Sequence, residues 1–410
     1  MPMFEPDETI FADELPLREN WQPDRIQERD EELAQYKAAL QPVINEAPPK
    51  NLFLYGKTGV GKTVATRYVL DHLQEDATEY GIDLTVVTQP CNSLNSSYQV
   101  AVALVNQFRS SDNQLPSTGY PQQDVFNVLF DELDKVGGTV LIVLDEIDNI
   151  GDDDDLLYEL PRAEANGYVD NVWPGVIGIS NDFTFRDQLS PKVKSTLCEE
   201  EIRFAPYNAN ELQNILQRRV DLAFHDGVVD GDVVPLAAAF AAQDSGNARQ
   251  GLRLLHKAGE LARGRGDDRV TTEHLQEAKT WLDRDQLEEG MREMTTQVHF
   301  VLCAVAQLAV QSETPAKTQH VYETYTALAE ELDANVLSER RVRDHLSELS
   351  MQGVLNVNER NTGIHGGSYY EYEISVDLAA VLDVLLDIDR LEGAAETLEQ
   401  QAQRRYLLDS

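Results

Sequence analysis

Two short segments of the chain carry the residue types that phosphate chemistry requires. The first, at 56–63, reads Gly-Lys-Thr-Gly-Val-Gly-Lys-Thr and fits the pattern G-x-x-x-x-G-K-[ST]. Its glycines let backbone N–H groups turn toward an anion, and a following helix directs its N-terminal dipole at the same point. We expect Lys62 to reach the β- and γ-phosphates and the Thr63 hydroxyl to ligate Mg²⁺. The loop therefore predicts a nucleotide site formed by Gly56, Lys57, Thr58, Gly59, Val60, Gly61, Lys62, Thr63 and Val64.

The second segment ends in two adjacent carboxylates. Residues 140–144 are an uninterrupted apolar run, typical of a buried parallel strand, and Asp145 and Glu146 follow it. Open α/β sheets bind their ligands at the carboxyl ends of strands. We expect Asp145 to hold the Mg²⁺ shell and Glu146 to orient or polarise the attacking water. Together, the two segments predict a nucleotide-binding P-loop domain.

The elements that must position these residues alternate between strand and helix patterns. Short apolar strands are expected at 52–55, 84–89, 139–144, 175–180 and 201–204, with helical periodicity at 97–109 and 122–136. This order predicts an α/β fold with a parallel sheet. Asn181 follows the strand at 175–180, where a polar side chain could lie between the γ-phosphate and the attacking water. A turn-forming asparagine is the alternative.

Beyond Pro206 the pattern becomes helical, with helices expected at 207–225, 235–244, 250–262 and 271–282. Gly246 and Asn247 provide the chemistry of a helix start. Arg249, at the beginning of the third of these helices, could reach the γ-phosphate from the side. A surface arginine is the alternative.

Three further helices, at 296–310, 318–332 and 338–351, precede two strand-like segments around 362–367. This is the winged-helix plan, a relative of the helix-turn-helix. The first two turns of the third helix hold the predicted DNA-binding residues, which are Arg340, Arg341, Arg343 and His345. The alternative is that these are only solvated charges on a helix surface.

We divide the chain into an acidic, disordered leader (1–14), an α/β nucleotide-binding domain (15–205), a helical lid (206–290), a winged-helix domain (291–376) and a helical tail (377–410).

The chain of 410 residues is strongly acidic, with 72 Asp and Glu against 34 Lys and Arg and a formal net charge of −38. Such a balance normally argues against nucleic acid as a partner. The acids are spread along the whole chain, however, as expected for a very salty cytoplasm, where carboxylates keep the surface hydrated and salt screens their repulsion. We interpret the charge as adaptation to salt, with an acidic protein of an ordinary cytoplasm as the alternative, and it does not exclude DNA binding.

Several patterns are lacking from the sequence. It has no run of eighteen apolar residues, its start is acidic, and its three cysteines are widely separated. These features argue against a membrane span, a secretory signal, a disulfide framework and a zinc site, and they predict a cytoplasmic protein. The carboxylate run at 152–155 is interpreted as a solvated loop, with a metal cluster as the alternative.

The order of these parts resembles archaeal replication initiators of the origin-recognition-complex and cell-division-control (Orc/Cdc) type, in particular haloarchaeal members. The resemblance covers about residues 20–375 and implies an AAA+ ATPase with a helical lid and a C-terminal winged helix. It rests on the segments 54–63, 143–148, 178–181, 189–195 and 246–249 and on the winged-helix pattern.

The resemblance also implies roles for individual residues. Asn181 resembles the first sensor residue and Arg249 the second sensor arginine of the lid. Ile26, within a segment (23–29) that is similar to the family segment near the adenine, and Tyr207 are expected in the nucleotide site. The helix at 97–109 resembles the extra helix of initiators, which touches DNA.

Two positions depart from the family pattern. Lys192 stands where the family usually has an arginine that acts on the ATP of a neighbouring subunit, and a lysine is a point charge rather than a planar fork. Stimulation of hydrolysis in trans is therefore not predicted. The expected wing at 363–370 offers only His365 as a basic group, which weakens the prediction of a minor-groove contact.

The resulting hypothesis is an ATP- and Mg²⁺-dependent initiator that binds double-stranded origin DNA and helps recruit an MCM-type replicative helicase. Slow hydrolysis of ATP to ADP and phosphate would act as a switch, with self-association on DNA and no membrane partner. An ATP-switched winged-helix transcription regulator is the alternative with the same domains. A clamp-loader-like remodelling ATPase without sequence preference is a third, against which the arginines of the third helix argue.

Overall fold

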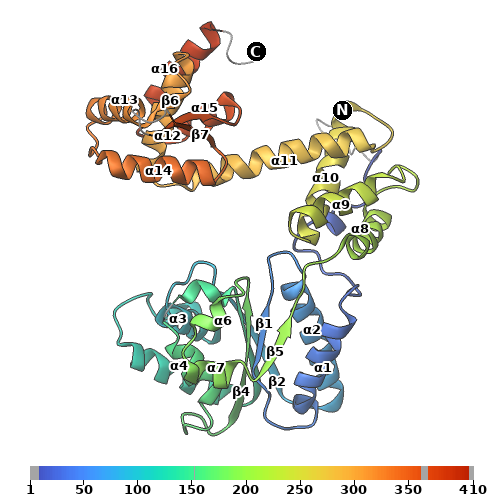
Figure 1. The fold of residues 1–410 in the computed structure, drawn as a ribbon. Helices are drawn as coiled ribbons and strands as arrows, with labels where there is room; N and C mark the ends of the chain where they lie inside the picture. Colours follow the sequence, from blue (N-terminus) through green and yellow to red (C-terminus); the bar gives the residue numbers. More distant parts are fainter. Residues whose placement is uncertain (1–8, 152, 362–367, 406–410) are drawn as a thin grey trace. The chain divides into compact units, whose positions relative to one another are not determined.

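A computed structural model describes residues 9–151, 153–361 and 368–405 (Figure 1). The chain divides into two units, Met1–Ala278 and Lys279–Ser410. The α/β sheet and the lid lie in the first unit, and the winged-helix elements lie in the second. Within the described residues, no helix is both long and apolar enough to cross a membrane.

Five parallel strands form the sheet of the first unit, in the order β2-β3-β4-β1-β5. Their bounds are β1 Leu52–Tyr55, β2 Leu84–Pro90, β3 Gly138–Asp145, β4 Val172–Ser180 and β5 Glu200–Arg203. Since β4 lies between β3 and β1, the chain segments that follow these three strands meet at one edge of the sheet. In the register, Tyr55 is opposite Ser180, and Asp145 is opposite Ile179.

Both faces of this sheet are covered by helices, which explains why its strands are apolar runs and not alternating patterns. Leu52 and Leu54 pack with α1 (Asp30–Ile44) and α2 (Lys62–Tyr80) on one face. Phe53 points to the other face. There it packs with helices that include α3 (Ser97–Phe108), α4 (Gln122–Val136), α5 (Asp155–Glu159), α6 (Phe185–Gln188) and α7 (Pro191–Leu197). Figure 1 shows α1 and α2 on one side of the strands and α3 and α4 on the other.

The lid consists of α8 (Ala209–Ala223), α9 (Val233–Asp244), α10 (Ala248–Arg265) and the start of α11 (Thr272–Arg292). The apolar faces of α8, α9 and α10 pack against one another, and Leu212, Leu216 and Leu255 are fully buried. The α11 helix extends ten residues past the end expected from the sequence at 282 and crosses the boundary between the two units.

Residues 9–14 are not the disordered leader that the sequence suggested. Ile10 and Phe11 are buried, and the Ala12 N–H donates to the Ala223 carbonyl oxygen at 2.8 Å. The Phe11 ring lies 4.8 Å from that of Phe224, centroid to centroid. It also fills the space beside Gly259, where an added Cβ would come within 2.3 Å of it. Residues 9–14 therefore pack on the lid through two apolar side chains and backbone hydrogen bonds; residues 1–8 lie outside the described residues.

The second unit has the winged-helix arrangement. Its helices are α12 (Thr296–Val310), α13 (Thr318–Glu331) and α14 (Glu339–Met351), and its antiparallel sheet has the order β6-β8-β7, with β6 Ala316–Lys317, β7 Leu355–Asn361 and β8 Ser368–Ile374. Two more helices, α15 (Leu378–Leu386) and α16 (Glu392–Arg404), share its core. The parallel sheet, the helical lid and the winged helix confirm the predicted fold class.

Candidate functional site

The phosphate loop lies between β1 and α2, as expected. Gly59 (φ 77°) and Gly61 (φ 92°) adopt the left-handed conformation that favours glycine. The Lys62 ammonium donates to the carbonyl oxygens of Gly56 at 2.7 Å and of Lys57 at 2.9 Å. The side chain of Lys62 is thus held inside the loop, where its charge faces the space that the loop encloses.

Burial changes the acidity of Lys62. Only 4% of this residue is exposed. Burial lowers the pKa of its ammonium to about 8, a shift that the carboxylates of Asp145 and Asp148 oppose and the charge of Arg249 assists. The amine is therefore charged at neutral pH but close to losing its proton, and a phosphate group beside it would raise the pKa again.

The magnesium-ligand candidates Thr63 and Asp145 lie side by side. The Thr63 hydroxyl donates to Asp145 Oδ2 at 3.0 Å. Burial raises the pKa of the Asp145 carboxyl, although the hydrogen bond from Thr63 opposes this shift. A hydroxyl and a carboxylate oxygen beside a phosphate loop fit Mg²⁺, which typically takes one or two protein oxygens, water and substrate phosphates. Among the described residues, no group of three or more His, Cys, Asp or Glu could hold a metal ion by itself.

Asn181 connects the lysine of the loop to the second carboxylate of the strand. Its Oδ1 accepts from the Lys62 ammonium at 2.9 Å, and its Nδ2 donates to Glu146 Oε1 at 3.3 Å. Its backbone N–H donates to Asp148 Oδ1 at 3.1 Å. Glu146 has a positive φ of 57°, uncommon for a residue other than glycine. Lys62 at the start of α2, Glu146 after β3 and Asn181 after β4 thus form one hydrogen-bonded group.

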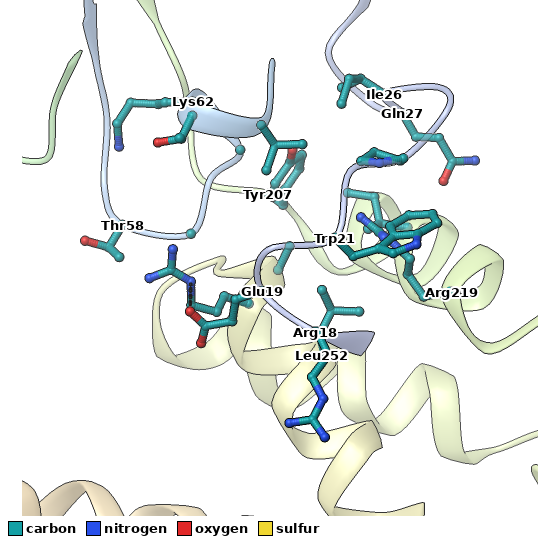
Figure 2. Close-up of a pocket in the computed structure, with 18 of the residues that line it drawn as sticks. Arg18, Glu19, Trp21, Ile26, Gln27, Thr58, Lys62, Tyr207, Arg219 and Leu252 are labelled. Atoms are coloured by element: carbon teal, nitrogen blue, oxygen red, sulfur yellow. Dashed lines mark ion pairs between the residues drawn. The ribbon is translucent and has the colours of Figure 1, made fainter. Parts of the chain in front are cut away.

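A pocket opens between the phosphate loop, residues 18–27 and the lid (Figure 2). Ile26 and Tyr207, both expected here from the sequence, line it together with Trp21. The Arg219 guanidinium lies 3.9 Å from the centroid of the Trp21 ring, and burial lowers its pKa to about 10. This mixture of aromatic, apolar and cationic groups fits the base end of a nucleotide. Sequence reasoning missed Trp21 and Arg219, because nothing in the spacing of two distant residues indicates that they stack.

The lid contacts the phosphate loop directly. The Ala248 N–H donates to the Gly59 carbonyl oxygen at 3.1 Å, and a Cβ added to Gly59 would meet Asn247 Oδ1 at 1.7 Å. Asn247 caps α10 by accepting from the Arg249 N–H at 2.9 Å. Arg249 therefore stands at the helix start expected from the sequence and lines the pocket. Its Nε lies 3.2 Å from Glu19 Oε2, an ion pair that Figure 2 marks with a dashed line.

Arg29 is a further residue that sequence reasoning did not assign. Only 4% of it is exposed, and its guanidinium donates to the carbonyl oxygens of Val60 at 3.0 Å and Ala205 at 2.6 Å. It also lies 3.8 Å from the centroid of the Tyr207 ring. Arg29 thus ties the phosphate loop to the segment that enters the lid. The sequence placed Arg29 within the segment 23–29 that is similar to the family segment near the adenine, but gave it no role of its own.

In its described part the acidic run is only partly solvated, since Asp153 and Asp154 are half-buried and Asp155 is exposed. Asp153 accepts from the Ser97 N–H and Asp154 from the Ser190 N–H, each at 2.9 Å, so the two carboxylates bind the N-termini of α3 and α7. Asp155 lies 3.7 Å from the Lys192 ammonium. Asp152 is outside the described residues.

The predicted DNA-binding residues lie on α14. Its apolar side is buried through Val342, Leu346 and Leu349. Arg340, Arg341 and Arg343 are exposed and His345 is half-buried. Arg343 pairs with Glu339 of the same helix at 3.2 Å, and His345 lies 3.2 Å from Glu348.

Two other predicted DNA contacts involve the wing and a helix of the sheet domain. His365 of the expected wing falls outside the described residues. On the sheet domain, the helix expected to touch DNA is α3, and the only basic residue predicted in it, Arg109, follows its end and binds Glu132 at 2.6 Å. A DNA contact through α3 therefore stays a prediction.

Comparison with known proteins matches three parts of the chain to described families. Residues 46–169 match the family described as AAA domain. Residues 213–280 match the Cdc6 AAA+ ATPase-type lid domain, and residues 289–384 match the CDC6 C-terminal winged helix domain. The three matches follow the order of the sheet, the lid and the winged helix.

Whole-chain relatives agree with this assignment. The chain is 49% identical to "ORC1-type DNA replication protein 15" of Haloarcula marismortui over 403 residues, which covers 98% of each chain. It is 51% identical to "ORC1-type DNA replication protein 1" of the same organism, covering 95% of each. A solved structure of the Aeropyrum pernix ORC1 protein in complex with DNA is 33% identical, with a TM-score of 0.81, and the match covers 95% of this chain and 99% of that one.

Proposed function

This chain belongs to the Orc/Cdc6 family of AAA+ replication initiators, and from that premise we propose that it binds origin DNA under the control of a bound nucleotide. The observation that carries the proposal is the hydrogen-bonded group of Lys62, Asn181 and Glu146, beside a lid arginine. A regulator without nucleotide chemistry has no need for these three residues to meet. The similar Aeropyrum ORC1 protein, solved with DNA, supports duplex DNA as the second ligand.

At the phosphate end, we assign each residue the task that its position allows. Lys62 binds the β- and γ-phosphates, and Arg249 approaches the γ-phosphate from the lid. Thr63 and Asp145 hold Mg²⁺, which neutralises charge on the phosphate oxygens when bound. Glu146 orients the attacking water, and Asn181 fixes the Glu146 carboxylate through its Nδ2. Trp21, Ile26 and Tyr207 bind the base.

Hydrolysis is slow in this scheme and serves as a switch. Glu146, the candidate general base, accepts a hydrogen bond from Asn181, so its carboxylate does not interact with the pocket alone. Lys192, at the position of the family's trans-acting arginine, lies 3.7 Å from Asp155 and 4.9 Å from the centroid of the Tyr158 ring within its own chain. Both features support a nucleotide that is bound for long periods between rare turnovers.

On the DNA side, α14 enters the major groove with Arg340, Arg341 and Arg343, and the origin complex then helps recruit the replicative helicase. A direct test is footprinting of the full-length protein in molar KCl on its own replicon and on random duplex of equal length. We expect protection of origin repeats in the presence of ATP. Equal binding to random DNA would contradict the proposal, and occupancy in cells confined to promoters would instead support a transcription regulator.

A further inference from the structure

The segment that precedes α1, residues 9–29, is here termed the N-terminal strap. It is anchored to the lid at its beginning, where Phe11 packs on Phe224 and Glu14 binds Arg263 at 2.6 Å and His256 at 3.0 Å. It then passes the pocket, which it lines with Arg18, Glu19, Trp21, Pro23, Arg25, Ile26 and Gln27. Glu19 thus lies between the anchored start of the strap and the residues that line the rest of the pocket.

Glu19 holds the guanidinium of the lid arginine. Its Oε2 lies 3.2 Å from Arg249 Nε, and the two side chains are 52% and 47% exposed. An exposed ion pair of this kind adds little to stability because water and salt compete with it. Arg249 can therefore exchange the Glu19 carboxylate for a stronger acceptor with little loss of stability.

A phosphate group is such an acceptor. Guanidinium groups bind phosphate oxygens through short, charge-assisted hydrogen bonds, often two at once. Arg249 and Lys62 of the loop line the same pocket. In the structure, the carboxylate of Glu19 supplies a negative charge to one of them.

We propose that Glu19 is the exchangeable partner of Arg249 and thereby sets the preference of the site for ATP over ADP. This inference rests on the proposed role of Arg249 as the γ-phosphate contact. A γ-phosphate must displace the Glu19 carboxylate from Arg249, whereas ADP, which lacks that group, leaves the pair in place. Glu19 therefore weakens ATP binding and leaves ADP binding unchanged.

The test is the substitution Glu19→Gln, which keeps the shape of the side chain and removes its charge. Affinities of the full-length protein for ATP and for ADP are measured by calorimetry in molar KCl. We expect ATP to bind about 2- to 5-fold more tightly, the range that an exposed ion pair allows, and ADP to bind as before. Equal tightening for both nucleotides, or no change for either, would overturn the inference.

Asp24→Asn is the matched control, since it removes one carboxylate from an exposed position of the same strap. In molar salt, charges are screened beyond about 3 Å, so only a carboxylate in direct contact with Arg249 should matter. We expect no change in either affinity for this variant. If Asp24→Asn changed ATP affinity as much as Glu19→Gln, the effect would come from the overall charge of the strap, and the specific role of Glu19 would be contradicted.

Arg249→Ala separates this inference from the function on which it rests. We expect Arg249→Ala to reduce the preference for ATP, and Glu19→Gln to have no further effect in that background, as a double-mutant cycle for a contacting pair requires. If Arg249→Ala leaves the ATP preference intact, the role of Arg249 itself is wrong. If Arg249→Ala removes the preference while Glu19→Gln alone changes nothing, only the role of Glu19 is wrong.

Discussion

The candidate nucleotide pocket and the exposed side of α14, which we propose to face DNA, are built in different ways. In the pocket, Lys62 is buried and hydrogen-bonded to three oxygens from two segments. On α14, Arg340 and Arg341 are exposed, and Arg343 forms an ion pair with Glu339 of the same helix. The side chains of the first site are held by contacts within the protein, whereas we propose that those of the second are positioned by the DNA.

This difference bears on how a protein with a net charge of −38 can bind two polyanions. Preorganised cations in a partly buried site act at short range and resist screening by salt. Exposed arginines lose most of their attraction for phosphates in concentrated salt. They retain contacts to base edges, which depend on geometry. We therefore expect substitutions to weaken nucleotide binding at the first site and to reduce sequence preference at the second.

The largest effect should come from Lys62→Ala. It removes a charge-assisted contact to phosphate. It also leaves two carbonyl oxygens of the loop and the Oδ1 atom of Asn181 without their hydrogen-bond donor. We expect ATP affinity to fall roughly 100-fold, measured by calorimetry. Lys37→Ala, at an exposed lysine of α1, is the control and should bind ATP normally. Unchanged affinity in Lys62→Ala would contradict the assigned site.

A smaller loss is expected for Arg341→Ala, which tests the other region. If Arg341 forms a bidentate contact to a base, its removal should reduce discrimination at that base pair by about 1–3 kcal/mol. Competition between origin and single-mismatch duplexes measures this directly. Arg390→Ala, an exposed arginine of the same unit outside α14, controls for net charge. Equal losses for the two variants would show that α14 does not read sequence.

The acidity of Lys62 predicts a pH dependence for the first region only. Free protein loses the Lys62 proton above about pH 8, whereas bound phosphate raises the pKa and keeps the proton in the complex. ATP affinity should therefore be highest below pH 8 and fall by up to about tenfold per pH unit above it. Lys62→Arg stays charged and should show a flat profile. The same decline in both proteins would assign it to another group.

The smallest expected change concerns salt. In molar salt, contacts to DNA phosphates contribute little to affinity. Origin binding should therefore fall only slightly between roughly 1 and 3 M KCl. A filter or anisotropy titration at fixed ATP checks this. A steep linear dependence of log affinity on log salt across that range would mean that phosphate contacts, and not base contacts, dominate on α14.

The sequence predicted the parts of the fold that depend on local pattern. The helix expected at 122–136 is α4 to the residue, since Gly137 follows an amphipathic run, and the strand ends place Asp145 and Asn181 as expected. Contacts between distant segments were not predictable. Ile10 and Phe11 gave no periodicity, and their burial depends on Phe224 and Gly259.

The candidate site shows the same division. Lys62, Thr63 and Asp145 follow from motif spacing because a phosphate loop and a strand end impose their geometry on nearby residues. Glu19, Arg29 and Arg219 act through partners between 31 and 230 positions away along the chain. Their roles depend on how the strap crosses the lid, which no local pattern encodes.

We propose that a bound triphosphate controls how the winged helix binds DNA. The most direct measurement is the affinity of the full-length protein for origin duplex in molar KCl with saturating ATP, with saturating ADP and without nucleotide. We predict distinct affinities, with the ATP-bound protein preferring origin over random DNA most strongly. Identical affinities and identical preference in all three states would contradict the account.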